Sequence, residues 1–545
     1  MVFRGEALML KIHVDQLGYR RDSRKLAVVA SDEPLKGPVS LVNVDNSTRV
    51  ELPFYATGED TYSGDTLWTL DFSHIQEKGR YFIEFYNNSR SPVFTISDSV
   101  YNDAFHDMIR MFYFQRCGCA LEARHAGPYT HDCCHTGKVI RYKDGCELEA
   151  ITGGWHDAGD YGRYTTAGAV AAAHLLYAYT LFPERCPDLQ LPESGNGVPD
   201  ILNECRYELE WLMKMQQADG GVAHKLTTTN HAPFIMPEED LAQLYLYPVS
   251  TMATADLAAV CALAERIYRP YDGAFADRLR SAALRARDFL RVHPEMIGFL
   301  NPPDCRTGSY QDRFDADERL WASAELFRMT GEQSDLEELT RLAEKLPYHT
   351  GLGWADVSGL AGLSVLTAPE NTFSSVLYEI FQKDFLDFAH RLLTLSESNG
   401  YHLAMMKEAF VWGSNMVVMS CAATLLLASQ LTGQRCYADA AEENIHYLFG
   451  RNPLDRSYVS GHGTFPFRNP HLRTTASDGI EEPFPGLVSG GPNARPCDDA
   501  ALAQIPNGTP PLYCHADDVG SFSTNEIAIY WNSIAVLVLA FFVQQ

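Results

Sequence analysis

The chain has 545 residues, a formal net charge of −26, 46% hydrophobic residues and 21% charged residues. This length exceeds that of an ordinary single domain, so we expect one small and one large unit. The negative charge disfavours nucleic acid or an anionic membrane as a partner, whereas an uncharged substrate meets no such repulsion.

The ends of the chain and its cysteines bear on the cellular location. The start, MVFRGEALMLKIHVDQ, lacks the apolar run of a signal peptide. The end, SIAVLVLAFFVQQ, is shorter than the roughly 20 residues of a membrane span, and we expect a buried last helix there. Thirteen cysteines, an odd number, argue against a disulfide scaffold. We therefore expect a cytoplasmic protein; secretion is the alternative if a signal peptide has been removed.

Residues 1–97 are predicted to form a small β domain. Short runs rich in Val, Ile, Phe and Tyr, such as KLAVVA, VSLVNV and RYFIEFY, are separated by turn residues such as those in EKGR. Their spacing suits an antiparallel sandwich of the immunoglobulin type.

Residues 98–545 are predicted to be mainly α-helical. Segments such as DILNECRYELEWLMKMQ and FADRLRSAALRARDFLRVH show helical periodicity, and the count of helices approaches a dozen. Two of them end at Gly331 and Gly433, as C-terminal glycines predict. No β-run alternates with the helices, which excludes a parallel α/β fold. Long loops, such as 451–520, interrupt the helices and are expected to carry function.

The stretch GGWHDAGDYGRY, residues 153–164, places two carboxylates three residues apart. The glycines around Asp157 and Asp160 permit tight backbone turns. Trp155 and Tyr161 are expected to offer flat apolar faces to a sugar ring. A structural role in a loop or at the start of a helix is the alternative for either aspartate.

Acidic residues also gather in HADDVGSFSTNEIAIYWNS, residues 515–533. The letters STNE fit a capping box, in which Ser523 caps a helix and Glu526 follows three residues later. In the functional interpretation, Glu526 and Asp160 stand on either side of a scissile bond, provided that the fold brings the two segments together.

A third segment, GRNPLDRSYVSGHGTFPFRNPHLR, residues 450–473, lacks helical periodicity. It carries His471 and Arg473 as hydrogen-bond donors, although a satisfied structural histidine is the alternative for His471. The three segments, in this order, resemble glycoside hydrolase family nine, the cellulase family with an (α/α)6 barrel, over essentially the whole chain. The β-rich start resembles the immunoglobulin-like domain that precedes the barrel in one subgroup.

The resemblance implies an inverting enzyme that cleaves β-1,4-glucosidic bonds in β-glucans or cello-oligosaccharides. Asp160 matches the general base, Asp157 the carboxylate that helps to hold the attacking water, and Glu526 the general acid. Inversion requires carboxyl groups roughly 6.5–9.5 Å apart. Glu526 must stay protonated near neutral pH, which predicts a pKa raised by burial or by neighbouring carboxylates. The remaining matches to positions that line the cleft are His471, Arg473 and Asp517.

Two positions depart from the family pattern. His515 stands where the family usually has an aromatic residue, and Phe465 where it usually has a basic residue or Asn. Both are expected near the cleft, where they would affect the preferred sugar or chain length. An exo-acting β-glucosidase or glucosaminidase of the same fold is therefore the alternative.

Cysteines and histidines suggest a structural zinc site. Cys117, Cys119 and the run HDCCH, residues 131–135, offer thiolates and imidazoles, which suit tetrahedral zinc. Free buried cysteines are the alternative, and the spacing does not choose among these residues. The resemblance to a zinc-bearing subgroup of the family points to Cys117, Cys134, His135 and His156.

The segment ESGNGVPDILNE, residues 193–204, suggests calcium, because oxygen ligands suit a hard cation. The alternative is a loop before a helix whose first turn favours acids. Relatives in the family often bind calcium near this segment, although Asn203 stands where they tend to have Asp. The candidate ligands are Ser194, Asp200, Asn203 and Glu204.

Two other classes of protein fit parts of the sequence. Another (α/α)6 carbohydrate enzyme, such as a lyase or an unsaturated-sugar hydrolase, would act on acidic sugars and need a basic site, whereas this candidate site is acidic. A non-catalytic glucan-binding protein would keep Trp155 and Tyr161 but would have no need of three carboxylates.

Overall fold

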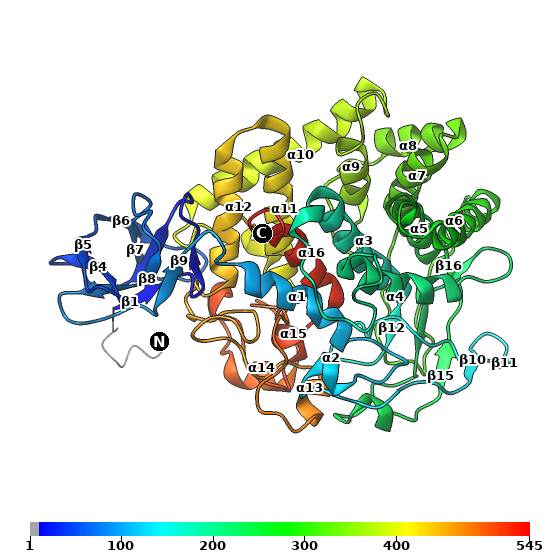
Figure 1. The fold of residues 1–545 in the computed structure, drawn as a ribbon, viewed down its shortest axis with the longest axis horizontal. Helices are drawn as coiled ribbons and strands as arrows, with labels where there is room; N and C mark the ends of the chain where they lie inside the picture. Colours follow the sequence, from blue (N-terminus) through cyan, green and yellow to red (C-terminus); the bar gives the residue numbers. More distant parts are fainter. Residues whose placement is uncertain (1–9, 545) are drawn as a thin grey trace.

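The computed structural model describes residues 10–544, so the first nine residues of the predicted β domain lie outside the described chain. The β domain stands to one side of the larger helical unit (Figure 1). One of its sheets has the strand order β1-β3-β7-β6 and the other β2-β9-β8-β4-β5, around one apolar core. The strands are β1 (Lys11–His13), β2 (Gly18–Tyr19), β3 (Leu26–Ala30), β4 (Val39–Asn43), β5 (Arg49–Glu51), β6 (Phe54–Glu59), β7 (Thr66–Asp71), β8 (Gly79–Phe85) and β9 (Phe94–Ile96).

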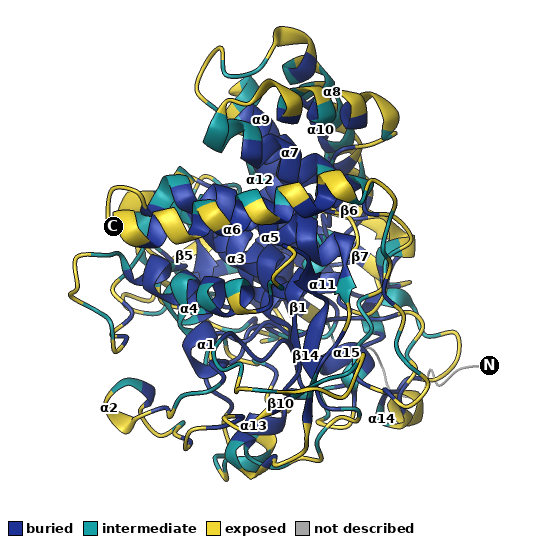
Figure 2. Cartoon of the chain, turned by 90° about the vertical axis from the view of Figure 1, so that its right-hand side faces the viewer, coloured by how far each residue is buried: buried dark blue, intermediate teal, exposed yellow. Residues whose placement is uncertain are grey.

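Long helices of an inner and an outer ring alternate along the rest of the described chain. Each outer helix packs on an inner one, and the outer helices expose one face, as α6 does in Figure 2. This arrangement confirms the predicted (α/α)6 barrel. The inner helices are α3 (Thr165–Leu181), α5 (Thr251–Tyr268), α7 (Ala316–Thr330), α9 (Ser358–Leu366), α11 (Ser414–Thr432) and α16 (Ile529–Leu539). The outer helices are α1 (Asn102–Phe114), α4 (Asp200–Lys214), α6 (Gly273–Val292), α8 (Gln333–Lys345), α10 (Ser375–Ser398) and α12 (Arg435–Leu448).

The helical pattern of the sequence located these helices well, with one exception. Helix α9 was missed, because its nine residues are short for a helix and all are buried, so no polar face marks its periodicity. Helix α16 is fully buried, as expected for the apolar end of the chain. Helix α11 is long and apolar enough to cross a membrane, but it packs against α10, α12 and α16 in the barrel.

Small sheets and short helices, which the sequence analysis did not predict, fill the loops between the barrel helices. A five-stranded sheet has the order β11-β10-β15-β14-β12, and β13 pairs with β16. These strands are β10 (Val139–Arg141), β11 (Glu147–Leu148), β12 (Arg163–Tyr164), β13 (Val222–Ala223), β14 (Lys225–Thr227), β15 (Leu244–Leu246) and β16 (Val249–Ser250). The short helices are α2 (Ala123–Ala126), α13 (Arg473–Ser477), α14 (Asp499–Gln504), α15 (Phe522–Asn525), η1 (Pro183–Arg185), η2 (Pro237–Glu239), η3 (Lys407–Ala409) and η4 (Pro511–Tyr513).

Buried charges join the β domain to helix α12. The Glu443 carboxylate is fully buried and forms ion pairs with Arg24 of the β domain, at 2.7 Å, and with Arg451, whose side chain is also fully buried. Burial alone would raise the pKa of Glu443, but the two guanidinium groups outweigh it and lower that pKa. Each of these charges has exchanged its hydration shell for charged partners in the protein. Removing one partner therefore leaves the others buried without compensation.

We expect Glu443→Ala to lower the free energy of unfolding by about 3–5 kcal/mol, because it leaves Arg451 buried without its counter-charge. Asp439→Ala on the same helix removes the partner of the exposed Arg435 and should cost less than about 1 kcal/mol. Urea unfolding of both variants tests this. Equal, small losses for the two variants would contradict it.

Candidate active site

Backbone contacts bring the three predicted segments together at one end of the barrel. Ala158 forms an antiparallel bridge with Ala528, and His471 forms a parallel bridge with Glu526. Gly159 lies where these backbone segments meet. A Cβ on Gly159 would lie 2.1 Å from the carbonyl oxygen of His471, so no larger residue fits without moving the backbone. The glycine therefore permits the approach that places the acidic residues in one site.

The three candidate catalytic carboxyls line one cavity of about 630 Å³. Asp157 and Asp160 come from the loop before β12, and Glu526 follows α15. This size is typical of ligand pockets, and aromatic walls with a few convergent polar groups suit a sugar. The aromatic residues of its wall are Tyr164, Tyr310, Trp354, Trp412, Phe522, Tyr530 and Trp531.

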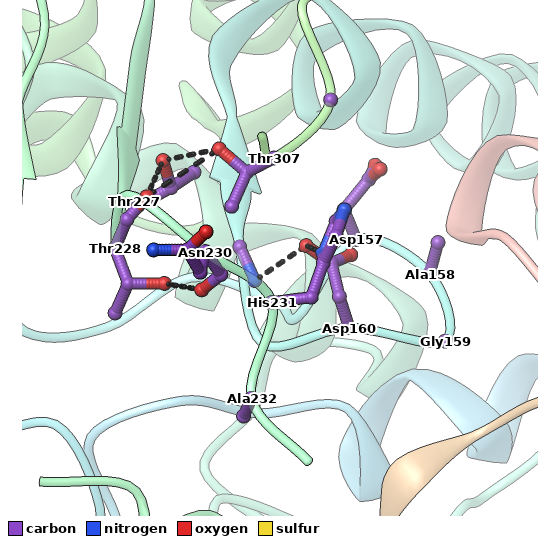
Figure 3. Close-up of polar contacts among 12 residues, drawn as sticks. Asp157, Ala158, Gly159, Asp160, Thr227, Thr228, Asn230, His231, Ala232 and Thr307 are labelled. Carbon is purple, nitrogen blue, oxygen red and sulfur yellow. Dashed lines mark hydrogen bonds and ion pairs between the residues drawn. The ribbon is translucent and has the colours of Figure 1, made fainter. Parts of the chain in front are cut away.

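Asp160 is held as a carboxylate. Its Oδ2 accepts hydrogen bonds from the Tyr164 hydroxyl at 3.0 Å and from the Gly162 N–H at 3.2 Å, and His231 Nδ1 lies 3.3 Å away (Figure 3). Burial alone would raise the pKa of Asp160, but the His231 contact and the charge of Arg473 outweigh it and lower that pKa. A carboxylate that keeps its charge in a buried site is suited to accept a proton.

Asp157 lies in a different environment from Asp160. Its Oδ2 accepts a hydrogen bond from the Tyr310 hydroxyl, and its buried Oδ1 has no hydrogen-bond partner in the described chain. Burial and the nearby charge of Asp160 raise the pKa of Asp157 well above its ordinary value. Asp157 lines the cavity, but its Oδ1 is enclosed by the surrounding protein.

Glu526 is a partly buried carboxyl that directly follows α15. Burial, and then the charges of Asp160 and Asp157, raise its pKa well above the ordinary value, which is the shift that the sequence analysis expected. The capping-box alternative is wrong. Helix α15 spans Phe522–Asn525, so Glu526 follows this helix instead of standing in its first turn.

Trp155 and Tyr161 do not face the cavity, and the prediction that they stack on a sugar is wrong. Trp155 is 1% exposed, packs against Phe112, and donates its indole N–H to Glu204 at 2.8 Å. Tyr161 is also buried, and its hydroxyl donates to the carbonyl of Ile235 at 2.5 Å. Both rings stabilise the loop of Asp157 and Asp160 from the side that faces away from the cavity.

His471 and Arg473 both line the cavity, where the sequence analysis placed them. The Nδ1 of His471 lies 2.7 Å from the carbonyl oxygen of Val519. The guanidinium of Arg473 donates to the carbonyls of Gly159, at 2.5 Å, and Ala232, at 2.7 Å. Arg473 thus connects the loop of Asp160 to the loop of His231 while adding positive charge to the site.

Asp517 stabilises loops and does not line the cavity. Its carboxylate accepts from the N–H groups of Arg468 and Asn469 and pairs with the guanidinium of Arg456. This is a correction to its predicted place among the substrate-binding residues.

The two departures from the family pattern also lie away from the cavity. His515 is buried against Tyr458, with Nε2 3.1 Å from the Ser489 hydroxyl. Phe465 is 54% exposed and lines a separate hollow beside Arg456. The expectation that both stand at the cleft is therefore wrong.

The residues of the site that the sequence analysis missed include His231, Tyr310, Trp354 and Trp412. They come from loops between barrel helices, in segments with no motif that sets them apart from other loop residues. The one available signal was the position of the loops, because those at one end of an α/α barrel carry its site.

The predicted zinc ligands lie together in a buried cluster beside the catalytic loop. One ligand atom from each of Cys117, Cys134, His135 and His156 falls within 4.8 Å of every other. In the described residues this is the only such group of three or more metal-binding side chains. His135 Nε2 lies 3.3 Å from the Asp240 carboxylate, the outer contact that orients a metal-bound histidine. Two thiolates and two imidazoles fit a closed structural zinc site.

The predicted calcium segment is engaged in other contacts. Glu204 accepts from the Arg116 guanidinium, which occupies the place a cation would take. Asp200 accepts from the Ser194 hydroxyl at 2.5 Å, and Asn203 donates to Asp200. These contacts give calcium no support at residues 193–204.

Unpaired carboxyls lie instead between helices α5 and α7. All carboxyl oxygens of Asp256 and Glu318 are buried without a hydrogen-bond partner in the described chain. Burial, and then the nearby Asp317, raise the pKa of both groups well above their ordinary values. Both carboxyls therefore favour the protonated, uncharged form in the barrel interior.

Comparison with known proteins agrees with the geometry. Residues 101–539 match the Glycosyl hydrolase family 9 profile, and residues 9–89 match the Cellulase N-terminal ig-like domain. A cellodextrinase of Butyrivibrio fibrisolvens is 40% identical, with 98% of this chain and 99% of that protein covered.

Solved structures give the same result. A metagenome-derived family 9 endoglucanase superposes with a TM-score of 0.91 at 37% identity, over 98% of this chain and 99% of that one. A Zn-binding triple mutant of the family 9 endoglucanase J30 gives 0.90 at 32% identity, over 96% and 99%. The chain therefore belongs to glycosyl hydrolase family 9 and is an inverting glycoside hydrolase of the cellulase type.

Proposed function

We propose that Asp160 is the general base and Glu526 the general acid in the hydrolysis of soluble β-1,4-gluco-oligosaccharides. The observation that carries these roles is the opposite pKa shift of two carboxyls in one cavity. Groups whose environments drive their pKa values apart are the ones suited to act as an acid and a base at the same pH.

Hydrolysis with inversion is a single displacement. Asp160 takes a proton from a water molecule, and the water oxygen attacks the anomeric carbon. Glu526 gives its proton to the glycosidic oxygen as the bond to that carbon breaks. Asp157, which also lines the cavity, helps to hold the water. Tyr310 orients Asp157 through the hydrogen bond to Oδ2.

Several features favour soluble oligosaccharides over crystalline cellulose. The cavity, at about 630 Å³, is the size of a site for a small ligand. The cellodextrinase of Butyrivibrio fibrisolvens is a relative over nearly the full length of both chains. All thirteen cysteines are free, which suits a cytoplasmic location that imported short oligosaccharides can reach.

We also propose a structural zinc ion held by Cys117, Cys134, His135 and His156. Bound there, zinc would cross-link segments that are distant in sequence, and its closed ligand set gives it no part in the chemistry. Because His156 directly precedes Asp157, the ion would limit the movement of the catalytic loop.

Glu526→Gln and Asp160→Asn should each lower kcat on cellotetraose by about 10²–10⁴-fold, because each removes one proton-transfer group. Their melting temperatures should not fall, since each variant keeps a side chain of nearly the same shape. Asp518→Asn in the same loop should retain normal activity. If Glu526→Gln hydrolysed cellotetraose at the normal rate, Glu526 would not be the general acid.

Elemental analysis of protein purified without added metal should find close to one zinc per chain. Cys134→Ser should lose the zinc and lower both the melting temperature and kcat. The neighbouring Cys133 is exposed and outside the cluster, so Cys133→Ser should keep the metal. A zinc-free protein with full stability and activity would refute the zinc site.

Carboxymethyl cellulose and cellotetraose together test the substrate preference. We expect cellotetraose to be hydrolysed rapidly, while carboxymethyl cellulose loses viscosity slowly relative to the reducing ends released, because cleavage near chain ends shortens the polymer little. A steep early fall in viscosity would mean internal cleavage and would overturn the proposed preference.

A further inference from the structure

A buried lysine lies behind the active site. Lys225 is fully buried on strand β14, directly opposite Tyr164 of strand β12 in the antiparallel register. Its Nζ donates to the Asn301 side chain at 2.7 Å, to the Thr307 hydroxyl at 3.0 Å and to the Gly308 carbonyl at 2.7 Å. All three acceptors belong to one loop, residues 301–310, so the Lys225 ammonium holds the parts of that loop together.

The same cluster joins this loop to a second one, residues 227–232. The Thr307 hydroxyl lies 2.8 Å from the Thr227 hydroxyl, and Arg306 N–H donates to the Thr229 carbonyl at 2.7 Å. Figure 3 shows Thr307 in contact with Thr227 at the start of the second loop, and His231 in contact with Asp160 near the end of that loop.

Both loops end at the catalytic aspartates. Gly308 N–H donates to the Tyr164 hydroxyl at 3.0 Å, and that hydroxyl donates to Asp160. The 227–232 loop supplies His231 to the same carboxylate, and Tyr310 closes the 301–310 loop on Asp157. The contacts of His231 with Asp160 and of Tyr310 with Asp157 thus come from the two loops that Lys225 holds together.

The chemistry of the lysine pocket supports a charged ammonium. Cys305 Sγ lies 3.4 Å from Nζ and accepts from the Tyr247 hydroxyl at 3.1 Å. The rings of Tyr247 and Phe299 also face the ammonium. Burial lowers the pKa of Lys225 to about 8, and the nearby Cys305 and Asp160 oppose that shift. A buried charge with this many partners is costly to move, so it fixes its surroundings.

We propose that Lys225 is a positioning residue for catalysis. Its ammonium fixes the loops 227–232 and 301–310, and through Tyr164 and His231 it holds the Asp160 carboxylate in the geometry that activates water. Lys225 itself does not line the cavity, so it acts through these loops and not by contact with substrate. The proposal rests on the proposed role of Asp160 as the general base.

The test is Lys225→Met, which keeps the length of the side chain and removes the ammonium. We expect kcat on cellotetraose to fall about 10–100-fold, the effect of a displacement of order 1 Å in a catalytic group. KM should change less than kcat, because Lys225 makes no contact of its own with the cavity. Thr307→Val, which keeps the lysine charge, should lower kcat in the same way but less.

The acidic limb of kcat/KM gives a second readout, since it reports the base of the free enzyme. Contacts from His231 and Tyr164 and the charge of Arg473 lower the pKa of Asp160. Loosening the loops weakens these contacts, so the pKa of Asp160 rises and the acidic limb moves to higher pH in both variants. The charged or titratable groups that face Asp160 are His231, Tyr164, Arg473, His471, Asp157, Glu526 and Lys225.

Lys25→Met is the matched control. Lys25 is also fully buried, and its Nζ donates to the carbonyls of Arg21, Ser23 and Ser73, but it lies in the β domain. Lys25→Met should lower the melting temperature, as Lys225→Met does. It should nevertheless keep the kcat and the acidic limb of the wild type.

The outcomes distinguish the proposed role of Lys225 from the proposed role of Asp160. If Lys225→Met and Thr307→Val keep the kcat and acidic limb of the wild type, Lys225 serves stability alone and the proposal is wrong. A fall in kcat of the same size in Lys25→Met would also overturn it. If instead Asp160→Asn remains fully active, the assignment of the base has failed, which the wild-type and Asp160→Asn measurements show independently of Lys225.

Discussion

The active site depends on the close approach of backbone at Gly159. The Gly159 carbonyl accepts hydrogen bonds from the backbone and the side chain of Arg473, and its Cα lies against the His471 carbonyl. Through this contact a loop near residue 160 meets the segments near 472 and 526, which are far apart in the sequence. Helices alone would not place these groups together, because the carboxyls come from irregular chain at the end of the barrel.

That approach has an electrostatic consequence. Three carboxyls, Asp157, Asp160 and Glu526, share one buried cavity, so they cannot all be ionised at low cost. The stabilising contacts are distributed unevenly: His231 and Arg473 act on Asp160, whereas Asp157 has only the Tyr310 hydroxyl. The charge therefore settles on Asp160, and its presence helps to keep the proton on Glu526. The two catalytic pKa shifts are parts of one arrangement.

The sequence predicted the fold and the acidic residues better than the walls of the site. Helical periodicity and the order of the three motifs located the barrel, and the run of glycines around Asp157 indicated the tight loop. Trp155 was misassigned because an aromatic residue next to a catalytic motif looks the same whether it faces a sugar or, as here, the core against Phe112.

Other features depend on tertiary contacts that no local pattern encodes. Tyr310 and His231 reach the aspartates from separate loops, so no spacing in the sequence connects them. Glu526 fits a capping box locally, yet the chain turns after Asn525 and directs the carboxyl into the cavity. The acidic residues between α5 and α7 were missed because their separation in the sequence hides the fact that they meet.

The catalytic loop is supported from two sides by different means. On one side, the cluster of Cys117, Cys134 and two histidines is suited to a metal, and its last member, His156, precedes Asp157. On the other side, the ammonium of Lys225 gathers the loops that reach Asp160. In the proposed arrangement, one cation on each side would draw several segments of chain together, the zinc ion on the first and the Lys225 ammonium on the second. A loop held in this way can expose its carboxyls to substrate and still keep them within the narrow tolerance that proton transfer requires.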